Sequence, residues 1–141
     1  MRRWLYGALV LAGIGGIGIL WAEDAPSAGD QWTAPARAAR KANPVPADEK
    51  SIAAGKVLYL QECRACHGDA GKGDGPSAAT LEKKPGDLSS PKLWEQSDGA
   101  LFWKITNGRK PMPTFEQKFT DEQRWAVVNY VRTLAPRPAG K

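Results

Sequence analysis

The sequence predicts an all-α domain that follows a membrane-spanning helix and a flexible linker. Residues 1–22 contain a long run without charge, and residues 23–47 are rich in Ala and Pro. From residue 48 onward, residues that commonly cap helices are followed in the sequence by apolar residues at helical spacing. We therefore divide the chain into an N-terminal anchor (1–22), a linker (23–47), a domain (48–136) and a tail (137–141).

The N-terminal segment predicts a single-pass anchor. Trp4 to Ala22 is a run of nineteen residues without charge, close to the roughly 20 residues that cross a bilayer as a helix. Arg2 and Arg3 favour the cytoplasmic side, so the following domain would lie on the periplasmic side of the cytoplasmic membrane. The alternative is a secretory signal cleaved near residues 25–27, which predicts the same compartment.

The linker, residues 23–47, has prolines at positions 26, 35, 44 and 46 and no persistent apolar period. Such a composition predicts a partly extended tether. Trp32 is the unusual residue in it. This side chain lies either at the membrane surface or against the domain, and the sequence leaves both interpretations open.

The first helix of the domain is expected from about Asp48 to Glu62. Its apolar face contains Ile52, Gly55 and Tyr59. Glycine inside a helix costs roughly 1 kcal/mol relative to alanine. We explain Gly55 by a close crossing with another helix.

Directly after this helix comes C-x-x-C-H, from Cys63 to His67, which is the attachment motif of a c-type haem. Two thiols at this spacing can form thioethers with one haem, and the adjacent histidine can then ligate the iron. Cys63 and Cys66 are the only cysteines and His67 is the only histidine, so a Cys/His zinc site cannot be assembled. We expect one covalently bound haem c; the alternative is a disulfide between the two cysteines.

The second axial ligand is expected to be Met112. Haem iron takes His, Met, Cys or Tyr, and the histidine and both cysteines are already assigned. Met1 precedes the apolar run, which leaves Met112 between Pro111 and Pro113. Prolines restrict the backbone around them and can hold the sulfur in place. The alternative is a five-coordinate iron that is open to small ligands.

Two loops and two further helices complete the expected domain. Residues 68–76 contain four glycines and predict a tight loop, which lacks the G-K-[ST] ending of a phosphate loop. A short helix is expected over 77–82, and Pro85 and Pro91 bracket an irregular stretch.

The second half of the domain is expected to contain two longer helices. One runs from Gly99 to Thr106 with Asp98 as its N-cap. The other is opened by a capping box at Thr120–Gln123 and ends near Leu134. The side chains that we expect to line the haem are Leu101, Phe102, Trp103 and Ile105.

The sequence from about residue 50 to 134 resembles the class I mono-haem cytochrome c family. The resemblance rests on C-R-A-C-H-G, G-K-G-D-G-P, N-G-R-K-P-M-P and W-A-V-V-N-Y-V-R-T-L, in this order. It implies a fold in which the first and last helices of the domain cross and short helices surround the haem. It also implies that Val127 and Tyr130 meet Gly55 and Tyr59, and that a backbone carbonyl near Pro76 accepts the N–H of His67.

The charge balance indicates protein partners. The formal net charge is +5, and residues 51–141 carry +4 of it. The chain has no basic run or motif for nucleic acid, so we expect redox partners with acidic docking faces. The hypothesis is that some of the cations Arg64, Lys72, Arg109 and Lys110 steer these partners, and the alternative is that they are scattered solvated charges.

An iron with both axial positions filled leaves no position for a substrate. The expected function is therefore non-enzymatic, one-electron transfer in a periplasmic respiratory or photosynthetic chain. Two alternatives stay open. The first is that the protein is a fixed subunit of a larger membrane redox complex. The second is that it is a haem protein with ligand-binding or peroxidatic activity.

Overall fold

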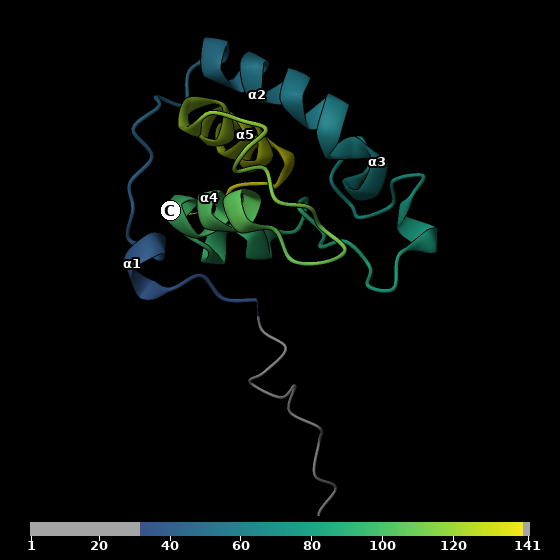
Figure 1. Ribbon diagram of the computed structural model, residues 1–141. Helices are drawn as coiled ribbons and strands as arrows, with labels where there is room; N and C mark the ends of the chain where they lie inside the picture. Colours follow the sequence, from purple (N-terminus) through teal and green to yellow (C-terminus); the bar gives the residue numbers. More distant parts are fainter. Residues whose placement is uncertain (1–31, 140–141) are drawn as a thin grey trace, which may run out of the picture. The chain divides into compact units, whose positions relative to one another are not determined.

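In a computed structural model of the chain, the structure describes residues 32–139. This part is helical and has no β-strand, as the sequence predicted. Its elements are α1 (Ala36–Ala39), α2 (Glu49–Glu62), α3 (Arg64–His67), η1 (Ala78–Thr80), η2 (Pro91–Glu95), α4 (Asp98–Asn107) and α5 (Asp121–Leu134) (Figure 1). The expected anchor over 1–22 lies outside the described residues. Within 32–139, no helix has the length and apolar character needed to cross a membrane.

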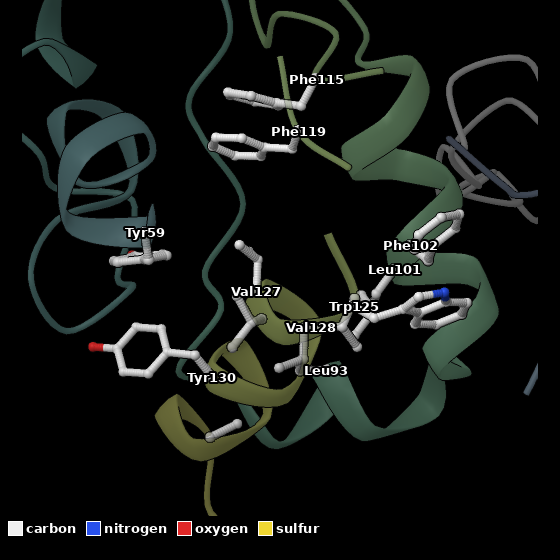
Figure 2. Close-up of a cluster of buried hydrophobic side chains, with 12 residues drawn as sticks. Tyr59, Leu93, Leu101, Phe102, Phe115, Phe119, Trp125, Val127, Val128 and Tyr130 are labelled. Carbon is white, nitrogen blue, oxygen red and sulfur yellow. The ribbon is translucent and has the colours of Figure 1, made fainter. Parts of the chain in front are cut away.

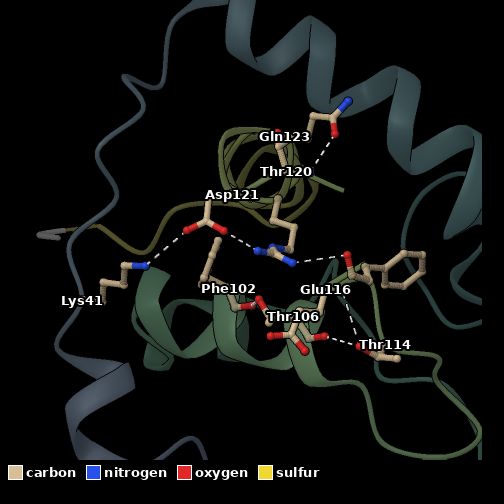
Figure 3. A network of polar contacts seen from close by, with 10 residues as sticks. Lys41, Phe102, Thr106, Thr114, Glu116, Thr120, Asp121 and Gln123 are labelled. Carbon is tan, nitrogen blue, oxygen red and sulfur yellow. Dashed lines mark hydrogen bonds and ion pairs between the residues drawn. The ribbon is translucent and has the colours of Figure 1, made fainter. Parts of the chain in front are cut away.

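The helices α2 and α5 begin where the sequence places them. Asp48 caps α2 by accepting a hydrogen bond from the Ser51 amide at 2.8 Å. In the capping box of α5, Thr120 Oγ1 accepts from the Gln123 amide and Gln123 Oε1 accepts from the Thr120 amide (Figure 3). Both helices end at the predicted residues.

The crossing of α2 and α5 forms the most extensive helix contact of the domain (Figure 1). At Gly55 the two backbones touch, because a Cβ there would overlap the carbonyl oxygen of Ala126. The Tyr59 and Tyr130 rings meet with centroids 5.1 Å apart. The expected meeting of Tyr130 with this face of α2 is therefore confirmed, whereas the nearest partner of Gly55 is Ala126 and not Val127.

The hydrophobic core gathers aromatic and aliphatic side chains from α2, η2, α4, α5 and the loop between α4 and α5 (Figure 2). Phe102 stacks on Trp125 with ring centroids 4.0 Å apart, and Phe115 stacks on Phe119 at 5.2 Å. The core residues are Tyr59, Leu93, Leu101, Phe102, Phe115, Phe119, Trp125, Val127, Val128, Tyr130, Val131 and Ala135. Partly buried side chains, including Cys63 and Met112, pack at its margin.

Residues 32–47, which we call the N-terminal strap, do not form the extended tether that their composition predicted. They contain α1 and belong to the same compact unit as the rest of the domain. Ala34 is buried, and Trp32 lies against Trp103 with ring centroids 6.5 Å apart. Of the two interpretations of Trp32, the structure shows packing on the domain.

Three smaller boundaries also differ from the expectation. The N-cap of α4 is Ser97, whose Oγ accepts from the Ala100 amide at 3.2 Å, while Asp98 pairs with Arg132. The segment 77–82 contains only the single turn η1. The irregular stretch after Pro85 contains η2, because Ser90 caps a proline-initiated turn there.

Candidate functional site

The attachment motif lies in the single turn that follows α2. The Cys63 amide still donates to Tyr59 O at 2.8 Å, and the carbonyl oxygen of Cys63 accepts from the amides of Cys66 (3.1 Å) and His67 (2.9 Å). No disulfide joins Cys63 and Cys66 in the structure, contrary to the alternative of a disulfide, so both sulfurs are available to a haem. The motif is thus presented on a rigid turn that is continuous with α2.

Burial raises the pKa of the Cys63 thiol to about 12. A cysteine with a raised pKa is neutral at physiological pH and is a poor nucleophile. Among residues 32–139, no group of three His, Cys, Asp or Glu side chains is arranged to hold a metal ion.

The glycine-rich loop folds back onto the attachment turn. The amide of Gly73 donates to His67 O (2.9 Å), that of Gly75 to Cys66 O (3.1 Å), and that of Ser77 to Ala65 O (2.8 Å). A side chain at Gly75 would overlap the carbonyl oxygens of the attachment turn. The predicted tight loop is confirmed, and its function in the fold is to brace the motif.

The imidazole of His67 is oriented by a backbone carbonyl. Nδ1 lies 3.2 Å from the carbonyl oxygen of Gly86. Because a carbonyl can only accept, Nδ1 carries the proton and Nε2 keeps its lone pair for a metal. Burial lowers the pKa of His67, while the bond to Gly86 opposes this shift.

The prediction that a carbonyl near Pro76 would orient His67 is wrong. The partner is ten residues further along the chain, at Gly86. The structure shows why: Gly73 lies so close to Pro85 that a Cβ on it would overlap the Pro85 carbonyl oxygen. This contact places the next carbonyl, that of Gly86, at the imidazole. A backbone acceptor leaves no residue-type signal, so the sequence could not locate it.

Met112 lies in a short loop that is fixed on both sides. The amide of Arg109 donates to Met112 O at 3.0 Å, and the amide of Met112 donates to Arg109 O at 2.9 Å. Beyond Met112, Thr114 Oγ1 donates to Thr106 O at 2.6 Å (Figure 3). The buried Arg124 donates from Nη1 to Phe115 O at 3.3 Å. The thioether is therefore carried by a constrained backbone, as the flanking prolines indicated.

These donors fit a c-type haem. The chain presents two free thiols one turn apart and a neutral imidazole with a free Nε2. It also presents a thioether at the margin of the apolar core. Of the expected lining residues, Leu101 and Phe102 are in the core and Ile105 is at its margin. Trp103 instead packs on Trp32.

Comparison with known proteins decides the family. Residues 50–131 match the family described as Cytochrome C oxidase, cbb3-type, subunit III. The chain belongs to this cytochrome c family. It is a mono-haem class I c-type cytochrome that carries one covalently bound haem c, attached through Cys63 and Cys66.

Curated relatives of the cytochrome are of two kinds. It is 33% identical over 85 residues to cytochrome c6 of Leptolyngbya boryana, covering 60% of this chain and 94% of that protein. It is 30% identical over 95 residues to the Cbb3-type cytochrome c oxidase subunit CcoP of Azospirillum sp. (strain B510), covering 62% of this chain. The cytochrome spans only 30% of the length of that CcoP subunit.

Solved structures show the same fold. A chain of the Kuenenia stuttgartiensis reducing HAO-like protein complex superposes with a TM-score of 0.60 at 34% identity, over 66% of this chain and 47% of that one. The KustC0563 c-type cytochrome superposes with a TM-score of 0.51 at 28% identity, over 58% of this chain and 98% of that one.

The four cations proposed to steer partners have different surroundings. Lys72 and Lys110 are exposed. Arg64 is also exposed and lies 3.7 Å from Asp69. Arg109 is half-buried, with its guanidinium carbon 5.7 Å from the centre of the Trp32 ring. Lys72, Lys110 and Arg64 are therefore the three exposed candidates, and Arg109 is the half-buried one.

Proposed function

We propose that this cytochrome is a one-electron carrier whose iron is ligated by His67 and Met112. The observation that carries the proposal is the orientation of His67, whose Nδ1 faces the Gly86 carbonyl and whose Nε2 is left to bind iron. Met112 is the candidate for the opposite side, because it is the only methionine of the domain and lies in a fixed loop.

When bound, the haem supplies an Fe(III)/Fe(II) couple. The chain tunes that couple in two ways. A thioether ligand from Met112 favours Fe(II) over Fe(III). The apolar core beside it further disfavours the extra positive charge of the oxidised state. With both axial positions occupied by side chains, no position remains for a substrate, which favours a carrier over an enzyme.

The test is a spectrum of the holoprotein before and after Met112→Ala. We expect the unchanged ferric protein to show the charge-transfer band of methionine–iron ligation, and its ferrous form to resist carbon monoxide at neutral pH. M112A should lose the band and bind carbon monoxide readily. Lys110→Ala, in the same loop but with an exposed side chain, is the control and should behave as the unchanged protein.

An unchanged ferric protein without that band, or one that binds carbon monoxide as readily as M112A, would contradict ligation by Met112. That result would favour the ligand-binding or peroxidatic alternative.

We also propose that residues 1–22 keep the cytochrome attached to the outer face of the cytoplasmic membrane. The support is the charge-free run from Trp4 to Ala22 behind Arg2 and Arg3. Membranes that carry the protein should retain it through washes with high salt and release it with detergent. Release by salt alone, or a mature N-terminus beyond residue 22, would contradict the anchor.

A fixed subunit of a larger membrane complex is the second candidate. Two of the similar proteins carry names of assembled systems, the CcoP oxidase subunit and the HAO-like complex. Mild detergent extraction followed by native electrophoresis and haem staining separates the two candidates. A band at the size of the single chain supports a free carrier, and a band within a larger complex supports the subunit.

A further inference from the structure

The N-terminal strap, residues 32–47, precedes the segment matched by the family, which begins at residue 50. Its attachment to the domain is nevertheless extensive. Asn129, in the middle of α5, is only 4% exposed, and a buried amide is costly unless its hydrogen bonds are made. Its Oδ1 accepts from Asn43 Nδ2 at 2.7 Å. Its Nδ2 lies 3.2 Å from Val45 O and 3.1 Å from Pro46 O.

The N-terminal end of α4 is shaped to receive the strap. Gly99 leaves room for the backbone of α1, since a Cβ there would lie 2.6 Å from Lys41 O and would overlap Ala38 O. Ser97 Oγ donates to Ala39 O at 2.5 Å. Ser97, at the N-cap of α4, and Gly99, within α4, thus both contact a segment outside the matched family region.

Lys41 fastens the strap over the aromatic stack of the core. Its ammonium nitrogen lies 4.7 Å from the centre of the Phe102 ring and 3.8 Å from Asp121 Oδ2 (Figure 3). Cation–π contacts contribute about 0.5–1 kcal/mol at exposed sites. The strap is therefore held at several points along its length by α4 and α5.

The beginning of the strap contacts the side of the domain that carries the Met112 loop. The Trp32 ring contacts Trp103 and two cations, with Lys104 Nζ at 5.3 Å and the Arg109 guanidinium carbon at 5.7 Å from its centre. Arg109 exchanges both backbone hydrogen bonds with Met112. A short path of contacts therefore leads from Trp32 through Arg109 to the methionine.

We propose that Trp32, at the beginning of the N-terminal strap, positions the axial methionine by acting through Arg109. The indole face holds the Arg109 side chain, and the paired backbone bonds transmit that restraint to Met112. Loss of the indole lets the loop move away from the iron more often. This inference rests on the proposed ligation by Met112.

The experiment is a titration of the ferric holoprotein with imidazole, which competes with the methionine for the iron. The variant Trp32→Ala should bind imidazole about fivefold more tightly, as expected for the loss of one cation–π contact of about 1 kcal/mol. Its methionine–iron charge-transfer band should weaken in parallel. Trp32→Phe keeps an aromatic face, so its imidazole affinity should be close to that of the unchanged protein.

Two further variants make the test specific. Arg109→Gln removes the guanidinium that contacts Trp32 while leaving Trp32 in place, and it should raise imidazole affinity as W32A does. If W32A does not fold, R109Q provides the test. Asn43→Ala weakens the strap at its other end. It should lower the unfolding midpoint while leaving imidazole affinity within about twofold of the unchanged protein.

The outcomes are distinguishable. Equal imidazole affinity in the unchanged protein, W32A and R109Q overturns this inference while leaving Met112 as the ligand. Equal increases in W32A and N43A also overturn it, because the effect would then follow general stability. Absence of the charge-transfer band from the unchanged protein overturns ligation by Met112, and this inference with it.

Discussion

Arg132 connects three parts of the domain through one side chain. From α5, its Nε donates to Asp98 Oδ1 at 2.8 Å, its Nη1 to Leu93 O at 2.8 Å, and its Nη2 to Gln96 O at 2.6 Å. The guanidinium also lies over the Trp94 ring, 4.7 Å from its centre. The Arg132 side chain is only 12% exposed, whereas the Asp98 side chain is 40% exposed.

Arg132→Ala should lower the free energy of unfolding by about 2–4 kcal/mol. Truncation removes three hydrogen bonds and the contact with the Trp94 ring, and the carbonyl of the buried Leu93 then carries the full desolvation cost of an unpaired group. The measurement is denaturant unfolding of the holoprotein. The control is Lys118→Ala, which breaks the more exposed ion pair of Lys118 with Glu62 and should cost at most about 1 kcal/mol. Equal costs would contradict the assignment of Arg132 as a buried connector.

At the scale of single residues, the sequence was informative where chemistry requires a residue type at a set spacing. Cys63, Cys66 and His67 are of this kind. It failed where the partner is a backbone atom or a distant side chain. Gly86 orients His67 through its carbonyl, and Asn129 meets the strap across more than eighty positions. Neither residue stands out by type or by local pattern.

Among the elements, α2 and α5 depend on a single position for their close approach. Gly55 lies where the α2 backbone meets the carbonyl of Ala126, and the Cβ of Tyr130 is 3.0 Å from the space that a side chain would need. Since Cys63 follows eight residues later at the end of α2, a shift at the crossing also moves the attachment turn.

Gly55→Ala should destabilise the domain by about 1–3 kcal/mol, although alanine favours helix formation by roughly 1 kcal/mol. The reason is that the overlap involves backbone atoms of α5, which cannot rotate away. Thermal unfolding of the holoprotein is the measurement. Ala53→Gly, at an exposed position of the same helix, measures the difference in helix propensity between alanine and glycine alone. It should lower the free energy of unfolding by about 1 kcal/mol. A stabilising effect of G55A would show that the helices do not cross this closely.

The long helices could be predicted because capping residues and the spacing of apolar residues depend only on positions that are close together in the sequence. Thr120 and Gln123 define the start of α5, and Asp48 defines the start of α2. The strap escaped prediction for the opposite reason. Its Ala- and Pro-rich composition is typical of a linker, and its docking comes entirely from long-range contacts with α4 and α5.

For the molecule as a whole, the apolar core and the cofactor are expected to stabilise each other. Cys63, Met112 and Ile105 pack at the margin of the core and are only partly buried by protein. A small domain commonly needs such an added component to reach full stability. The described part of the cytochrome fits this pattern.

Loss of haem attachment through Cys63→Ala combined with Cys66→Ala should lower the unfolding midpoint by roughly 10 °C or more, because each kcal/mol corresponds to about 4–8 °C in a domain of this size. Circular dichroism during heating is the measurement. The unchanged sequence produced without haem attachment is the matched control and should behave in the same way. A haem-free chain that unfolds within a few degrees of the holoprotein would contradict this dependence.

The basic surface is expected to influence the rate of electron exchange. Reduction or oxidation by an anionic reagent such as hexacyanoferrate should slow as salt is added, because screening weakens attraction to exposed cations. The pair of substitutions Lys72→Ala and Lys110→Ala should reduce both the rate and its salt dependence. Lys50→Ala, near the opposite end of α2 from the attachment turn, is the control. A rate that is independent of salt would argue against electrostatic steering.

The amide of Asn129 has a consequence for how the domain opens. Detachment of the strap would remove two acceptors of Asn129 Nδ2 and the donor to its Oδ1, leaving Ser51 Oγ of α2 as the remaining acceptor, so water would have to reach this buried amide or α5 would have to shift. We therefore expect fraying of the strap to be coupled to loosening of α5. Amide hydrogen exchange along α5 consequently reports on whether residues 32–47 are seated, although none of those residues belongs to that helix.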